Sequence, residues 1–358
     1  MRHVPYRSLS TTARAGVMPA IAVILAIGMA ATAAAQMGPR SRAHTTLQSD
    51  GTPDRLPATS QAPGTQSVTA TVEGDQRIII ASGMPGHAVG RFPNSGNPHS
   101  IRVQNYRITL DATPQKAGRT TPARGYPFGI ALNGVVFDPG AAEWYQGRPG
   151  PWQYEPLSGA VPLGLDANNA HVQPSGAYHY HGLPEGLMAQ LGVSRDTHSP
   201  LIGWAADGFP IYALYGHLDG ADPASPIIEH SSGYRLKQGR REPVEARGRF
   251  ADAPTPGGYY DGTFVADYTY VEGQGTLDEC NGTFTVTPDH PEGTYAYFLT
   301  RDWPVIPRCF AGTPSESFSA MRPARAGGRV DGNRDGNRPA RPGGPRDGDR
   351  FGRPPQRF

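Results

Sequence analysis

Three of the chain's eleven histidines fall within the stretch 171–181, which reads HVQPSGAYHYH. In a β-strand, side chains two residues apart point to the same face of the sheet, so the alternation Tyr-His-Tyr-His places His179 and His181 side by side. Tyr178 and Tyr180 then share the opposite face. Adjacent imidazoles on a rigid strand indicate a candidate site for a transition metal.

Whether His171 joins this pair depends on the length of the loop between the two strands. Residues 174–176, Pro-Ser-Gly, predict a three-residue hairpin loop, because Pro suits the first central position of a type I turn and Gly can adopt the left-handed conformation. In that register His171 pairs with His179, and three imidazoles meet on one face. A two-residue loop would instead pair His171 with Tyr178 and turn its side chain to the other face.

The three histidines, His171, His179 and His181, are therefore the predicted metal ligands. Neutral imidazole is a borderline ligand that suits Zn, Cu or non-haem Fe, and nothing in the sequence selects among these ions. A three-histidine site with an open position could activate water for hydrolysis or could activate O₂. The alternative is a buried strand rich in Tyr and His, with imidazoles held by hydrogen bonds and no metal.

Three carboxylates in predicted turns are candidate catalytic groups. Asp207 stands at an Asp-Gly turn between two apolar runs, where it could orient an imidazole, bind a metal, act as a general base or only stabilise the turn backbone. Asp278 and Glu279 form an adjacent acidic pair in the segment Asp-Glu-Cys-Asn-Gly. We expect one of these carboxylates to complete or orient the histidine site, although acidic turns are commonly only solvated.

The elements around these residues predict an all-β domain, a sandwich or a barrel-like fold with long loops. Gly and Pro together are abundant, with 46 and 37 residues, and no long amphipathic helix is evident. Short β-branched or aromatic runs predict strands, including hairpins at residues 67–81, around Asn133-Gly134 and around Asp207-Gly208. A short helix is expected over residues 184–191, with Gly192 at its end. Residues 219–258 are predicted to be a polar surface excursion.

The two ends of the chain differ from this β domain, which we place at residues 67–320. Residues 1–35 combine three Arg, an apolar run and a small-residue cleavage motif, which predicts a secretory signal peptide or, failing cleavage, a membrane anchor. Residues 36–66 are predicted to be a flexible linker. Residues 321–358 hold ten Arg and four Asp among Gly and Pro, which predicts a disordered basic tail. We therefore expect a periplasmic or secreted protein.

The chain contains two cysteines, Cys280 and Cys309. In an exported protein this number favours one disulfide, because such compartments are oxidising. A copper site that includes cysteine is the alternative, and the spacing does not suit a Cys-X-X-Cys redox centre.

The segments around these motifs resemble those of the YHYH-domain family of exported proteins. The resemblance rests on residues 170–184 with the YHYH tetrapeptide, on GWAADGFPIY at 203–212, on LDECNG at 277–282 and on PVIPRCF at 304–310. It implies that the histidine hairpin and the turns at 207–208 and 278–282 belong to one constellation. It implies no particular reaction.

Two classes of function follow. The first is an exported metal-binding β protein that performs hydrolysis or oxygen chemistry. The second is a non-catalytic module that carries metal or binds an envelope carbohydrate through Trp144, Trp152 and neighbouring tyrosines. A small molecule or an envelope polymer is the candidate ligand. No motif indicates specific nucleic-acid binding, and membrane contact is expected only through an uncleaved signal segment or weak attraction of the tail. No feature indicates an oligomeric state.

Overall fold

The structure, a computed structural model, describes residues 55–125, 127–244 and 253–321. The predicted signal peptide, most of the predicted linker and the predicted tail beyond Met321 lie outside these residues. In the described part, none of the helices is long and apolar enough to span a membrane.

An eight-stranded open sheet forms the centre of the molecule and confirms the all-β prediction. Both of its faces carry buried side chains, and the strands are short and rich in aromatic and β-branched residues, which suit a pleated, packed surface. Its strand order is β15 (Gly282–Thr287), β16 (His290–Leu299), β10 (Pro210–Ala213), β9 (Gly203–Ala205), β5 (Gly129–Ala131), β6 (Val136–Phe137), β8 (Tyr178–Tyr180) and β7 (Ala170–Val172).

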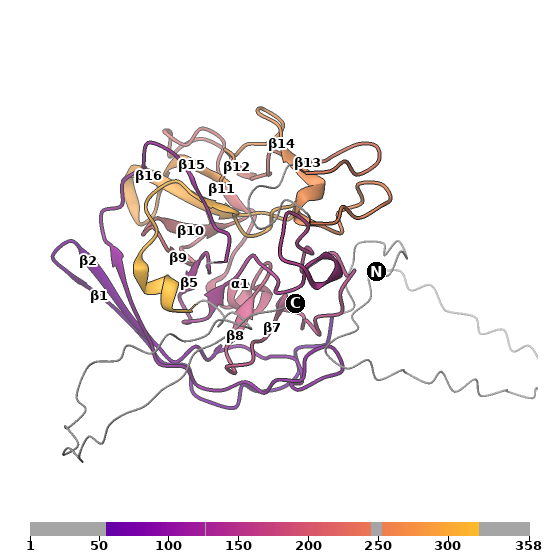
Figure 1. Cartoon of the computed structure of the whole chain (residues 1–358). Coiled ribbons are helices and arrows are strands. Elements are labelled where there is room, and N and C mark those ends of the chain that lie inside the picture. Colours follow the sequence, from indigo (N-terminus) through magenta and orange to yellow (C-terminus); the bar gives the residue numbers. More distant parts are fainter. Residues whose placement is uncertain (1–54, 126, 245–252, 322–358) are drawn as a thin grey trace, which may run out of the picture. The chain divides into compact units, whose positions relative to one another are not determined.

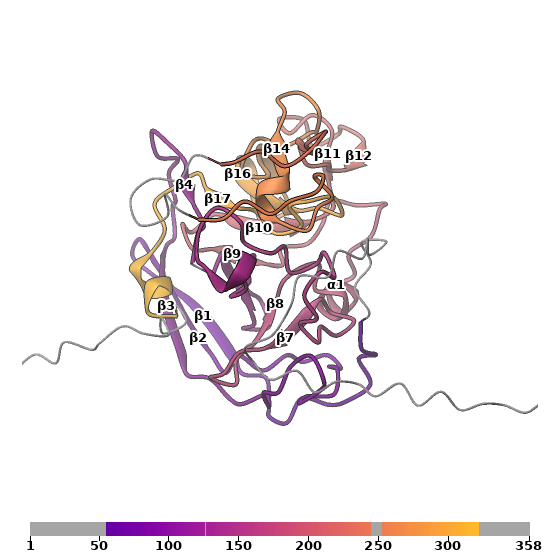
Figure 2. The same ribbon diagram turned by 45° about the vertical axis from the view of Figure 1, so that its right-hand side comes forward.

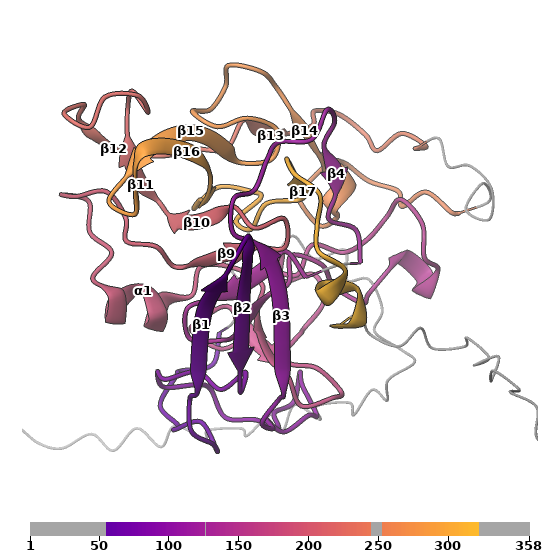
Figure 3. The same ribbon diagram turned by 90° about the vertical axis from the view of Figure 1, so that its left-hand side faces the viewer.

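Smaller sheets surround this one (Figures 1 and 3). A three-stranded antiparallel sheet of β1, β2 and β3 faces the viewer in Figure 3. Three further pairs join β11 to β12, β13 to β14 and β17 to β4. The bounds of these strands are β1 (Val68–Glu73), β2 (Gln76–Ala81), β3 (Tyr106–Asp111), β4 (Thr121–Pro122), β11 (Tyr215–His217), β12 (Ile227–Glu229), β13 (Tyr234–Leu236), β14 (Tyr268–Tyr270) and β17 (Cys309–Phe310).

Helix is scarce in the described part of the chain. The α-helix α1 (Glu185–Leu191) ends at Gly192, whose φ of 72° is the left-handed conformation that closes a helix, as predicted. It buries Leu187 and Met188 in the same core cluster as Tyr178 and Tyr180, and it lies beside β7 and β8 (Figure 2). The described residues also form 3-10 turns at η1 (Tyr145–Gly147), η3 (Val265–Asp267) and η4 (Glu316–Met321).

The predicted hairpins are present, whereas two regions differ from expectation. Residues 55–66, expected to be flexible linker, contact the domain: Leu56 N–H donates to the Leu165 carbonyl at 3.0 Å, and Ser60 exchanges backbone bonds with Val89. The expected surface excursion at 219–258 contributes strands β12 and β13. These two strands are half exposed and only three residues long, so they are too short to show the apolar alternation that identifies a strand in a sequence.

A disulfide joins Cys280 and Cys309, with their Cα atoms 5.1 Å apart, and confirms the predicted pairing. It connects the turn before β15 to strand β17. We expect replacement of both cysteines by Ala to lower the free energy of unfolding by about 3 to 4 kcal/mol, because the bond closes a loop of 29 residues. Urea unfolding of the two proteins measures this difference, and equal midpoints would contradict it.

Candidate metal centre

The histidine hairpin folds in the predicted register. Strand β7 pairs with β8 so that His171 lies opposite His179. Gln173 and Ala177 close the loop, with a backbone hydrogen bond of 2.9 Å, and Gly176 has a φ of 89°. The loop therefore has three residues, and all three imidazoles lie on the same face of the sheet.

Gly176 is required by this loop for two separate reasons. Its left-handed φ disfavours any other residue, and an added Cβ would lie 2.6 Å from the Cβ of Arg102. We expect Gly176→Ala to lower the free energy of unfolding by about 2 kcal/mol. Gly192→Ala is the matched control, because Gly192 has a similar φ of 72° but open space around it, and should cost about 1 kcal/mol. Equal losses in urea unfolding would show that the close approach to Arg102 is unimportant.

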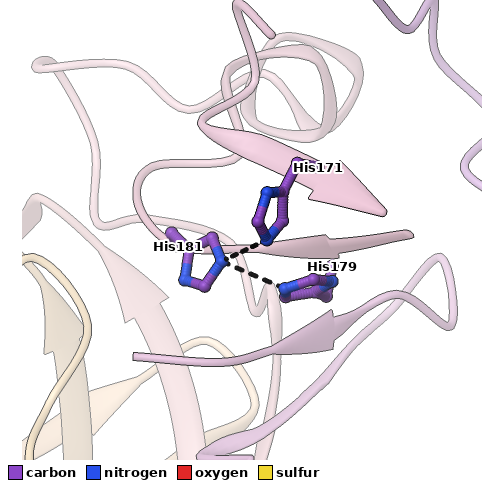
Figure 4. Close-up of side chains that lie close together, drawn as sticks. All are labelled: His171, His179 and His181. Carbon is purple, nitrogen blue, oxygen red and sulfur yellow. Dashed lines mark hydrogen bonds between the residues drawn. The ribbon is translucent and has the colours of Figure 1, made fainter. Parts of the chain in front are cut away.

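The three imidazoles converge on one point through their Nε2 atoms (Figure 4). His181 Nε2 lies 3.0 Å from His179 Nε2 and 3.0 Å from His171 Nε2. The potential ligand atoms of the three residues all lie within 4.8 Å of one another, and no carboxylate of the described residues belongs to this group. Around a tetrahedral zinc ion, nitrogens at about 2.0 to 2.1 Å are separated by roughly 3.3 Å, so the spacing fits one small cation.

The Nδ1 atoms of two of these rings face carbonyl oxygens. His171 Nδ1 lies 2.8 Å from the Leu163 carbonyl, and His179 Nδ1 lies 3.2 Å from the Ala177 carbonyl. The Asn97 amide nitrogen lies farther from His171 Nδ1, at 3.3 Å. A carbonyl only accepts a hydrogen bond, so a proton on Nδ1 satisfies each of these carbonyls and leaves Nε2 to act as the ligand atom. The Nε2 atoms are therefore the candidate ligand atoms.

Burial keeps the imidazoles of His179 and His181 neutral. His179 is 2% exposed and His181 is 3% exposed. Burial lowers the pKa of His179 to about 4. It also lowers the pKa of His181 well below the usual value, with smaller contributions from the two neighbouring histidines. Neutral imidazole is the form that binds a metal, so His179 and His181 are ready to act as ligands at neutral pH.

The tyrosine face of the same strand is a buried hydrogen-bond network. Tyr178 donates to Asp166 at 2.7 Å, and the Tyr180 hydroxyl lies 2.6 Å from His87 Nε2 and accepts from Asn133 at 2.8 Å. His87 belongs to a loop rich in Gly and Pro and is nevertheless only 7% exposed, because this loop folds against the strand. The tyrosines thus fix the strand while the histidines face the other way.

Asp207 lies at a different place in the sheet. It occupies the turn between β9 and β10, where its Oδ2 accepts from Tyr297 at 2.6 Å and from the Gly312 N–H at 2.9 Å. Burial raises the pKa of this carboxyl. The contacts of Asp207 therefore connect the turn to β16 and to the segment after β17, and they do not include the three histidines.

The acidic pair Asp278 and Glu279 is also held elsewhere. Asp278 accepts hydrogen bonds from Tyr295 and from the backbone N–H groups of Cys280 and Gly282, and Glu279 accepts from Thr120. These contacts stabilise the disulfide-bonded turn before β15. The role predicted for the two acids at the histidine site stays a prediction without a contact to support it.

Asp138 is the carboxylate that sequence reasoning missed. Strand β6 pairs in parallel with β8, and Asp138 directly follows β6, with its N–H donating to the Tyr180 carbonyl at 2.8 Å. Burial raises the pKa of Asp138 to about 6. A strand alternation around Val136-Phe137 puts Asp138 on one face, but the parallel pairing to the histidine strand cannot be deduced from local sequence.

A cavity of about 390 Å³ lies beside the hairpin. Its lining includes Glu155, Asn169, Leu183 and Trp303. Asn169 also accepts the His181 N–H at 2.7 Å through its backbone carbonyl, so the cavity and the histidine strand share this residue. The Asn169 Oδ1 atom is buried without a hydrogen-bond partner. The volume is within the range of small-molecule sites.

The profile of the family described as YHYH protein matches residues 106–312, which is more than half of the chain. Searches of curated proteins and of solved structures find no match. The matched region contains the histidine hairpin, the cavity residues and both cysteines. This chain therefore belongs to the YHYH protein family.

Proposed function

We propose that this protein binds a transition-metal ion through His171, His179 and His181. The observation that carries the proposal is the meeting of three Nε2 atoms, two of which belong to rings whose Nδ1 atoms face carbonyls. The potential ligand atoms of the three residues all lie within 4.8 Å of one another. A single cation at their centre could contact all three imidazoles.

Three protein ligands leave a coordination position for a further molecule, which is typical of catalytic zinc sites. A bound Zn²⁺ would polarise a substrate or activate water for hydrolysis, and bound Cu or Fe would support oxygen chemistry. The chain's own contribution would be the orientation of the rings of His171 and His179, since the carbonyl facing each Nδ1 determines which nitrogen faces the ion.

The predicted cellular location agrees with this proposal. We propose export to the periplasm or the medium, supported by the disulfide and by the signal-like composition of residues 1–35. N-terminal sequencing of the mature protein tests it, and a start at Met1 would contradict cleavage.

Elemental analysis of the full-length protein, purified from its exported fraction without an affinity tag, tests the metal proposal. We expect close to one equivalent of Zn, Cu or Fe per chain in the wild type and none in the His179→Ala/His181→Ala double variant. The His99→Ala variant is the control, because His99 lies in a loop outside the cluster. Metal-free wild-type protein that also fails to take up Zn²⁺, Cu²⁺ or Fe²⁺ on dialysis would refute the proposal.

The cavity supports a second candidate, the binding of a small saccharide without catalysis. Trp152, expected to be part of a binding platform, is 2% exposed and packs in the core. Trp303 instead lines the cavity with its ring stacked on Tyr268 at 4.2 Å, near the unpartnered Asn169 Oδ1. Titration with cellobiose and N,N′-diacetylchitobiose, followed by tryptophan fluorescence, tests this candidate. If this candidate is correct, the saccharide binds to the His179→Ala/His181→Ala variant as it does to the wild type, and it does not bind to Asn169→Leu.

A further inference from the structure

Asp138 lies next to His181 on the sheet face that carries the histidines. In the parallel pairing of β6 with β8, Val136 is opposite His179 and Phe137 is opposite Tyr180. Paired residues of parallel strands point to the same face, as the rings of Phe137 and Tyr180 do with their centroids 5.6 Å apart. The next residue therefore turns back to the histidine face.

A second contact places the carboxylate over that face. Gln173 lies two residues after His171 at the end of β7, so its side chain shares the histidine face. Its Nε2 lies 3.4 Å from Asp138 Oδ2. Strand β8 lies between β6 and β7 in the sheet, so this contact reaches across the strand that carries His179 and His181.

The negative charge of the Asp138 carboxylate has few hydrogen-bond donors and no ion-pair partner among the described residues. Its Oδ1 accepts from the Gly140 N–H at 3.0 Å, and its Oδ2 has the long contact to Gln173. The nearby cation is Arg308, which forms its ion pair with Glu155 instead. Asp138 is half-buried, and carboxylates that are largely removed from water are ordinarily paired with a cation or placed beside a metal.

We propose that Asp138 is the anionic neighbour of the metal's open coordination position, where it accepts a hydrogen bond from a protic ligand. This inference rests on the proposed metal site. Asp138 is not expected to be a direct ligand, because its oxygens lie outside the group of atoms within 4.8 Å of one another. It is a positioning residue, which favours water or an alcohol at the ion and disfavours an anion.

The test uses the full-length protein loaded with Co²⁺ at pH 8 and titrated with sodium azide, with the visible absorption of Co²⁺ as the readout. We expect Asp138→Asn to keep one equivalent of Co²⁺ and a tetrahedral spectrum while binding azide about tenfold more tightly, because a nearby negative charge is removed. Asp289→Asn is the matched control, since Asp289 contacts Tyr212 and not the histidine face. Asp138→Ala replaces the Asn variant if that variant does not fold.

Three other outcomes would each contradict a different part of the proposal. Azide affinity equal to that of the wild type would mean that Asp138 is only structural. A changed Co²⁺ spectrum with weaker Co²⁺ binding would make it a direct ligand and would overturn the outer position. Failure of the wild type to bind Co²⁺ would refute the metal site itself, which is a separate result.

Discussion

His181→Ala should weaken Zn²⁺ binding about 10²- to 10³-fold in the full-length protein. His181 is the central member of the cluster, because its Nε2 makes both of the 3.0 Å contacts. Structural zinc sites with four ligands bind with apparent free energies of about 10 to 16 kcal/mol, so one ligand accounts for roughly 3 to 4 kcal/mol. Competition with a chromophoric chelator measures the affinity.

The matched control for this experiment is His87→Ala. His87 is also buried and also contacts the YHYH strand, but through the Tyr180 hydroxyl on the opposite face. We expect that variant to be less stable yet to bind Zn²⁺ with wild-type affinity. Equal losses of affinity in the two variants would mean that strand integrity, not ligation, controls the binding.

The histidine convergence could be predicted because every determinant is local. A hairpin of eleven residues fixes its own register through its loop, and Gly176 provides the left-handed residue that a three-residue loop needs. The period of two along the strand then separates histidines from tyrosines. The Asn-Gly and Asp-Gly hairpins, the disulfide and the end of α1 at Gly192 could be predicted from equally short-range or compositional signals.

The carboxylate beside the histidines could not be predicted in the same way. Asp138 reaches the site through the parallel pairing of β6 with β8, two strands that are about 40 residues apart in the sequence and whose pairing has no local signature. The acids that stand out in the sequence, such as Asp207, are noticeable because they sit in turns. Turn acids commonly bond nearby backbone or hydroxyl groups, and Asp207 bonds Tyr297 and the Gly312 N–H.

Acid should destabilise the metal-free protein, and two buried histidines account for much of the effect. The pKa of His179 and the pKa of His230 are each lowered from 6.5 to about 4, mainly by burial. The unfolded chain therefore binds more protons than the folded chain between these values. The free energy of unfolding is therefore highest above pH 6.5. It falls by about 3 kcal/mol for each of these residues as the pH is lowered toward 4.

Asp138 acts in the opposite direction, because burial raises its pKa from 3.8 to about 6. Its folded form binds a proton more readily than its unfolded form, so stability is regained as the pH falls from about 6 toward 3.8. As the pH falls, the histidines therefore lower the free energy of unfolding and Asp138 raises it. Single variants are needed to separate the two contributions.

Urea unfolding of the metal-free protein between pH 7.5 and 4 provides this separation. We expect His179→Gln and His230→Gln each to reduce the loss of stability over this range by about 3 kcal/mol relative to the wild type, because neither Gln takes up a proton. His230 contacts Phe298 and Thr276, far from the proposed ligand set, so its effect should be independent of metal. For His179, added Zn²⁺ should hold the folded ring deprotonated and make the wild type more sensitive to acid. If both variants lose as much unfolding free energy between pH 7.5 and 4 as the wild type does, the prediction is wrong. Burial would then not lower the pKa values of His179 and His230.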